Sequence, residues 1–185
     1  AEIVSIEMRP EAPTPLLVRR DASTGEEFDS HPLSVANPGV IEISADGSSI
    51  AIGSMGPYKV TVLDAETLQR TAIGTSGVAF DISPDGGTIA LGQEDGTVVL
   101  VDSASGERTE MDGRHAAAVQ GVGFSPDGST LVTTGDDRDV LVWDLETGSL
   151  NEILHGHAGK PFGPAFDATG DTAFTAGLDG RVIAW

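Results

Sequence analysis

The sequence contains no cysteine, few aromatic residues and only two lysines. Without cysteine the chain can form no disulfide, no Cys-ligated zinc site and no Cys nucleophile. This composition suits a reducing compartment, and we expect a cytoplasmic location. Aromatic residues make up 5% of the 185 residues, so Val, Ile, Leu and Ala must fill most of a core, and a hydrophobic content of 39% is enough to build one.

Cationic residues are also scarce, and no long apolar run occurs. The formal net charge is −19 at pH 7, and such a surface repels nucleic-acid phosphates and anionic lipids. No apolar run approaches the ~18–20 residues of a membrane-spanning helix. We therefore expect neither nucleic acid nor membrane as a partner. The sign of the charge favours a basic peptide or protein surface, although acidic turns also keep a β-rich chain soluble.

What the sequence does contain is a repeat. A turn motif recurs at intervals of about 40 residues, and its clearest copies are Ser83-Pro84-Asp85-Gly86 and Ser125-Pro126-Asp127-Gly128. In such a turn proline presets φ, the Asp side chain bonds to the backbone, and glycine accepts a positive φ. Weaker copies begin at Ser44 and Asp167. A period of roughly 40–45 residues is the length of one four-stranded propeller blade.

Short apolar segments between these turns predict strands. In the best-formed repeat they are Val119–Phe124, Thr130–Thr134, Val140–Trp143 and Leu150–Leu154, and the same order recurs upstream without any convincing helical periodicity. We therefore predict one all-β domain of four-stranded antiparallel blades. Its predicted divisions are the end of an incomplete blade (1–39), three complete repeats (40–77, 78–118 and 119–159) and an incomplete last repeat (160–185).

These residues resemble WD40 repeats, a family of β-propeller interaction scaffolds. The resemblance is closest over residues 119–154, which carry Phe124 and the following turn, Asp137, and the apolar strand that ends in Trp143-Asp144. Gly156-His157 stands where the Gly-His pair of the family opens the next repeat. The residues from 78 to 102 keep the pattern with Val101 in place of Trp. Recognisable repeats extend from Val40 to Trp185.

The resemblance implies buried hydrogen-bonded clusters of four side chains that support the blades. Carried over by position, one cluster comprises His115, Thr133, Asp137 and Trp143, and the other comprises His157, Thr175, Asp179 and Trp185. The resemblance also implies partner-binding loops before the first strand and between the second and third strands of each blade. In this sequence those loops carry Glu94, Arg114, Asp136, Arg138, Lys160 and Phe162.

The resemblance implies a ring of usually seven blades, which needs roughly 290 residues. This chain holds about four and a half units and begins and ends within a unit. Three interpretations follow: a fragment that pairs with the missing part of the same propeller as a second chain, a ring assembled from copies, or a compact four-bladed variant. We favour the first. A weaker resemblance is to WD40 regions of large bacterial signalling and regulatory proteins.

Catalytic and metal-binding chemistry find little support in the sequence. The histidines at 115 and 157 already have a place in the repeat, and no Gly-x-Ser-x-Gly elbow occurs. The innermost strands are expected to present only apolar residues and glycine to the axial channel. We therefore predict no catalytic residue, no metal site and no cofactor.

The predicted function is that of a non-enzymatic protein–protein interaction scaffold, which presents a rigid loop face to a peptide or partner domain. One alternative is a sensor or autoinhibitory module of a bacterial signalling protein that is regulated by assembly. A less favoured alternative is a propeller enzyme that binds a small molecule or metal.

Overall fold

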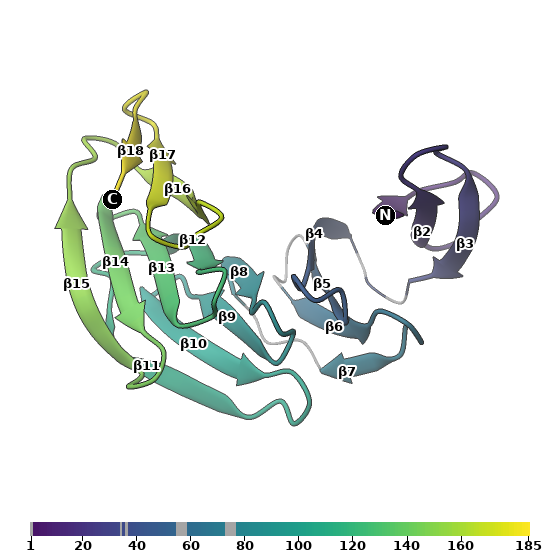
Figure 1. Ribbon diagram of the computed structural model, residues 1–185, viewed down its shortest axis with the longest axis horizontal. Helices are drawn as coiled ribbons and strands as arrows, with labels where there is room; N and C mark the ends of the chain where they lie inside the picture. Colours follow the sequence, from purple (N-terminus) through teal and green to yellow (C-terminus); the bar gives the residue numbers. More distant parts are fainter. Residues whose placement is uncertain (1, 34, 36, 55–58, 73–76) are drawn as a thin grey trace.

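The computed structural model describes residues 2–33, 35, 37–54, 59–72 and 77–185. All regular structure in these residues is β, which confirms the predicted all-β class. No helix in the described part of the chain is long and apolar enough to cross a membrane. The strands form five consecutive blades that follow one another along an open arc, with the two ends of the chain at its two ends (Figure 1).

Within the described residues the first and last blades have three strands each and the others have four. The first blade contains β1 (Glu2–Glu7), β2 (Leu16–Asp21) and β3 (Glu27–Pro32), and the second contains β4 (Pro38–Ile43), β5 (Ser49–Ser54), β6 (Val60–Asp64) and β7 (Arg70–Ala72). The third contains β8 (Ala79–Ile82), β9 (Thr88–Gly92), β10 (Thr97–Asp102) and β11 (Arg108–Arg114). The fourth contains β12 (Val119–Phe124), β13 (Thr130–Gly135), β14 (Asp139–Asp144) and β15 (Ser149–His155), and the fifth contains β16 (Pro161–Phe166), β17 (Ala173–Gly177) and β18 (Val182–Ala184).

Within each blade, strands that are neighbours in sequence pair antiparallel. The third and fourth blades also join at their outer edges, where Asp112 pairs in parallel with Ser149. Their eight strands therefore form one sheet, ordered β12-β13-β14-β15-β11-β10-β9-β8, and β8 also lies against β12 at the inner side. The two blades thus meet at both their inner and their outer strands.

The recurring turn motif forms a hydrogen-bonded unit between the first two strands of a blade. In the third blade the Ser83 hydroxyl donates to Asp85 Oδ1 (2.6 Å), and the Thr88 N–H donates to Ser83 Oγ (2.9 Å). Gly86 has a φ of 71°, which glycine adopts without strain. The same Ser–Asp bond closes the turns at Ser44 (2.7 Å) and Ser125 (2.6 Å). The repeat in the sequence is therefore a repeated turn.

The aspartates that end the third strands form the second kind of turn. Asp102 Oδ1 accepts the N–H groups of Ser105 (2.6 Å) and Ala104 (3.1 Å), and these bonds lower the pKa of Asp102. In the first blade the Ser23 hydroxyl, with two backbone N–H groups, lowers the pKa of Asp21 to about 2. Because hydrogen bonds to a carboxylate favour its charged form, these turns are built around ionised aspartates.

The core lies between the blades rather than inside any one of them. Apolar side chains cluster at each junction, and sheet stacking of this kind buries one face of each blade against the next. The cluster between the third and fourth blades contains Ala90, Val98, Leu131, Leu141 and Trp143. The cluster between the fourth and fifth contains Val132, Val140 and Ala173. The arc is therefore held together junction by junction.

Candidate functional site

The fourth blade contains a buried hydrogen-bonded cluster. His115 Nδ1 lies 3.0 Å from Asp137 Oδ1, and His115 Nε2 lies 2.8 Å from Thr133 Oγ1. The Trp143 indole N–H donates to the same hydroxyl oxygen (2.9 Å). Because one hydroxyl can accept from the indole and donate to the imidazole, a neutral histidine with its proton on Nδ1 satisfies every group in the chain of bonds.

The fifth blade repeats the arrangement. His157 Nδ1 lies 3.1 Å from Asp179 Oδ2, and Thr175 Oγ1 lies 2.8 Å from both His157 Nε2 and the donating Trp185 Nε1. Burial alone would raise the pKa of Asp179. The N–H groups of Ala158 and Arg181 and the neighbouring imidazole outweigh the effect of burial and hold the pKa of Asp179 at about 2. The structure thus brings together the eight residues named for the two clusters in the sequence analysis, as two sets of four.

These clusters are structural rather than exposed reactive groups. The side chains of His115 and His157 have no solvent-accessible surface, and the Thr133 hydroxyl already serves two partners. A nucleophile needs a free approach for the substrate. In the third blade Leu91 occupies the position of the threonine, and Asp95 is exposed and bonds to Thr97 instead. That blade is held by apolar packing.

Each cluster anchors the loop that leads from the preceding blade into its own blade. Asp137 Oδ2 accepts the Ala116 N–H (2.7 Å), and Asp179 Oδ2 accepts the Ala158 N–H (2.8 Å). The carboxylates therefore fix the backbone of the loops 114–118 and 156–160 as well as the histidines. A loop held at both its side chains and its backbone keeps one conformation.

Hydrogen bonds connect these loops into one continuous edge of the arc. We call the loops 93–96, 114–118, 135–138, 156–160 and 177–180 the loop rim. The connecting backbone bonds run from the N–H groups of His115, Asp136 and Leu178 to the carbonyls of Gly96, Ala118 and Lys160. The Lys160 ammonium group joins the loops 135–138 and 156–160, because it donates to Asp136 Oδ2. The motif turns form the opposite edge, where the N–H groups of Ser103 and Leu145 donate to the carbonyls of Gly87 and Ser129. We call that edge the turn rim.

Five of the six predicted partner-binding residues lie on or at the loop rim. Glu94, Arg114 and Arg138 are exposed there. The Lys160 ammonium group donates to Asp136 Oδ2 (2.7 Å), so those two residues form an ion pair between neighbouring loops. Arg138 adopts a positive φ of 75° at the tip of its turn. The rim therefore presents side chains of both charges on a fixed backbone.

The expectation that Phe162 belongs to a loop is wrong. Phe162 is the second residue of β16 and pairs with Ala176 of β17. Its side chain is 43% exposed and lies on the face of the fifth blade that points away from the fourth. The residue is a large exposed apolar group, but it is part of a sheet surface rather than of the loop rim.

The expectation for the axial channel is also wrong. A pocket of about 500 Å³ lies between the innermost strands, and Glu42, Asp81 and Gln120 line it beside apolar residues. The Phe124 N–H of the fourth blade donates to Asp81 Oδ2 (2.8 Å), so this carboxylate links two blades. Burial raises the pKa of Asp81, and burial together with the charge of Asp81 raises that of Glu42.

A surface pocket adjoins the loop rim on the third blade. Its volume is about 450 Å³, and Gln93, Glu94, Asp95, Arg108 and Glu110 line it. Gln93 Nε2 is buried and makes no hydrogen bond within the described residues. The pocket therefore combines carboxylates with an amide donor that an incoming acceptor could use. No pattern in the sequence predicts this pocket, because Arg108 and Glu110 come from the outer strand β11.

Comparison with known proteins agrees with the geometry. The family described as WD40 (WD domain, G-beta repeat) matches residues 108–144, which run from β11 to the end of β14 and include the first buried cluster. A search of curated proteins found no match. The repeat match and the antiparallel blades together identify a WD40-type β-propeller fold. Repeats of this family generally mediate protein–protein interaction.

Proposed function

We propose that this chain is a non-enzymatic scaffold that binds a protein or peptide partner at the loop rim. The proposal rests on the buried groups that fix the loop rim in one conformation. Asp137 and Asp179 each bind a buried histidine and a backbone N–H group of the rim. A partner that meets a fixed surface does not have to order it, and that lowers the entropic cost of binding.

The charge of the chain favours a basic partner. The formal net charge is −19, and a field of one sign raises the association rate of oppositely charged partners. Glu94 and Asp95 are exposed at the rim and also line the pocket on the third blade. A lysine or arginine side chain of a partner would meet carboxylates there, while its backbone carbonyls could accept from the unpaired Gln93 amide.

Nuclear magnetic resonance of the isotopically labelled chain tests this proposal. The probe is a lysine-rich peptide, with a glutamate-rich peptide of equal length as its comparison. We expect the basic peptide alone to shift backbone resonances of the loop rim, and added salt to weaken the binding.

A pair of charge reversals locates the site. Glu94→Lys on the loop rim should weaken binding of the basic peptide several-fold, whereas Glu146→Lys, an exposed position on the turn rim, should leave it nearly unchanged. Equal effects of the two variants would show that the net charge of the chain, rather than a site on the loop rim, attracts the peptide. Shifts that cluster on the turn rim, or no binding at all, would refute the proposed site.

A further inference from the structure

The third blade differs from the two blades that follow it at the place of the buried cluster. Gln93, Gly135 and Gly177 begin equivalent turns, because the carbonyl of each accepts the N–H group three residues later (3.2, 3.0 and 3.0 Å). A Cβ atom on either glycine would lie 2.5 Å from Nδ1 of the histidine in its cluster. Glycine is required in the fourth and fifth blades because the cluster fills the space that a side chain would enter.

By its equivalence to those glycines, Gln93 directs its side chain toward this space in the third blade. The groups that fill the space in the later blades are replaced, since Leu91 and Val101 stand in the positions of the threonine and the tryptophan. The sequence has Ile73 in the position of the histidine, and this residue lies outside the described residues. Gln93 Nε2 is buried and has no hydrogen-bond partner in the described part of the chain. Because a buried unpaired donor costs free energy, an acceptor on a bound molecule would stabilise it.

Carboxylates with free oxygens surround the same place. Asp95 is equivalent to Asp137, but its hydrogen bonds within the described residues, from the N–H and hydroxyl groups of one threonine, both end on Oδ1. Its Oδ2 is therefore available, whereas Asp137 Oδ2 holds a backbone N–H group. Glu94 and Glu110 line the same pocket of about 450 Å³ and form no ion pair in the described part of the chain. Within the described residues the charged lining is three carboxylates and one cation, Arg108.

The carboxylate at the centre of this arrangement is ionised. Hydrogen bonds from Thr97, and to a smaller extent the nearby charge of Arg114, lower the pKa of Asp95. Hydrogen bonds and an opposite charge both favour the charged form of a carboxyl group. The pocket therefore offers a negative charge at neutral pH beside the unpaired amide of Gln93.

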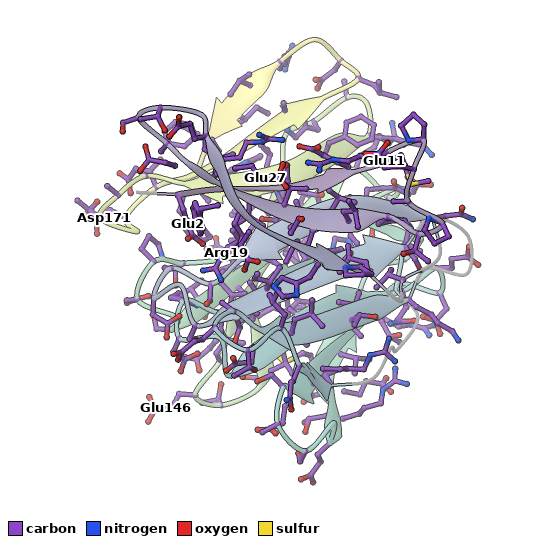
Figure 2. The ribbon with its side chains drawn as sticks, turned by 90° about the vertical axis from the view of Figure 1, so that its right-hand side faces the viewer. Glu2, Glu11, Arg19, Glu27, Glu146 and Asp171 are labelled. Carbon is purple, nitrogen blue, oxygen red and sulfur yellow. The ribbon has the colours of Figure 1, made fainter. Side chains whose placement is uncertain are left out.

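Carboxylates are also spread over the rest of the surface, so charge alone does not select this pocket. Figure 2 shows acidic side chains on the outside of the first, fourth and fifth blades, and the acidic residues that it labels are Glu2, Glu11, Glu27, Glu146 and Asp171. All five are exposed. A basic segment is thus attracted to many places, and a preferred place must offer matching geometry in addition to charge.

From these observations we infer that the pocket of the third blade holds an arginine side chain of the partner, an inference that rests on the proposed function. The guanidinium group is planar and carries five N–H donors, so one side chain can satisfy the carboxylates of Glu94 and Asp95 on the loop and of Glu110 on β11. A backbone carbonyl next to the arginine accepts from Gln93 Nε2. Arginine is favoured over lysine because a guanidinium group is less strongly hydrated and enters a pocket with apolar Val99 in its wall more readily.

A nuclear magnetic resonance titration of the full chain with three short blocked peptides tests this inference. The peptides share a sequence of glycine and serine around one central residue, which is arginine, lysine or citrulline. Citrulline keeps the shape of arginine but carries no charge. We expect the arginine peptide to bind at least about fivefold more tightly than the lysine peptide, and the citrulline peptide to bind most weakly. The arginine peptide should also shift the side-chain amide resonances of Gln93, one of three glutamines in the sequence.

Two variants of the pocket and one control locate the effect. Glu110→Gln removes a carboxylate of the pocket and Gln93→Leu removes its amide donor, so each should reduce the preference for arginine over lysine. Glu152→Gln is the matched control, because Glu152 is an exposed glutamate on the outer strand β15 of the fourth blade. It should leave the preference unchanged. Circular dichroism of each variant checks that the blades remain folded.

The results separate this inference from the proposed function. If the lysine-rich peptide shifts the loop rim but the single-arginine and single-lysine peptides bind equally, or the Gln93 side-chain resonances do not move, the pocket is not an arginine site and the rim remains the binding surface. An equal loss of preference in Glu110→Gln and Glu152→Gln would also overturn the inference, because net charge would then be the cause. If no basic peptide shifts the loop rim, the proposed function fails together with it.

Discussion

Thr133 and Thr134 are neighbours on β13 and both are completely buried, yet only one of their hydroxyls is hydrogen-bonded. Thr133 Oγ1 has His115 and Trp143 as partners. Thr134 Oγ1 has no partner within the described residues. Successive side chains of a strand point to opposite faces, so Thr134 turns away from the cluster, toward the junction where Gly121 and Gly163 lie in close approach.

The two threonines should respond oppositely to the same substitution. Thr133→Val removes the acceptor of a buried indole and should cost about 1–3 kcal/mol of unfolding free energy. Thr134→Val removes an unpaired buried hydroxyl and should be neutral or stabilise by up to about 1 kcal/mol. Urea unfolding of both variants measures the difference. A larger loss at position 134 than at 133 would contradict this assignment.

The tryptophans of the two clusters should also differ. Trp143 is fully buried, and Trp143→Ala should destabilise the chain by about 3–5 kcal/mol. Trp185 makes the same bond to its threonine but remains partly exposed, so Trp185→Ala should cost less. Thermal unfolding followed by circular dichroism compares the two. Similar losses would mean that Trp185 is covered in solution.

Glu42 should destabilise the fold at neutral pH. Burial and the charge of Asp81 raise its pKa in the folded chain, so its favourable contribution is present below the unfolded pKa and is lost as the pH rises through the folded pKa. Glu42→Gln should raise the melting temperature at pH 7 by about 1–2 °C. The gain should vanish below about pH 4, where the carboxyl is protonated in both states. An equal gain at both pH values would show that charge is not the cause.

The hydrogen-bonded aspartates of the turns and of the buried clusters should set the acid limit of the fold. The pKa values of Asp21 and Asp179 are held at about 2, below the unfolded value of about 3.9. Their contribution is therefore present above the unfolded pKa and is lost as the pH falls through the folded pKa. We expect the unfolding free energy to decline between about pH 4 and pH 2, and Asp179→Asn to make that decline shallower. A stability that is constant over this interval would contradict the prediction.

Local sequence patterns predicted the blades well because each turn is made by adjacent residues. The Ser–Asp bond and the positive φ of Gly86 need only the motif itself, so the repeat could be read without a structure. The positions of His115 and Trp143 likewise follow from their place in the repeat. The observed strands differ from the predicted ones mainly at their ends, as at β13, which continues past Thr134 to Gly135.

Contacts between blades were harder to foresee. Asp81 appears in an apolar strand, and its role becomes visible only when the Phe124 N–H of the next blade is placed beside it. The glutamates and arginines on the outer face of the first blade are 2 to 20 residues apart, and nothing in their spacing shows that they converge. Phe162 was predicted to lie in the loop before the first strand of its blade, whereas β16 begins at Pro161 and includes it. Tertiary neighbours, rather than local propensity, decide these positions.

The buried clusters also set the order in which the blades can form while the chain emerges from the ribosome. His115 meets its carboxylate 22 residues later in the chain, so the fourth blade cannot complete its polar interior until Trp143 has emerged. Val132 and Val140 then remain bare until the fifth blade follows. Because strand pairing within a blade joins neighbours in sequence, each blade can form as it appears and shield the apolar face left by the one before. Folding in this order exposes one blade face at a time.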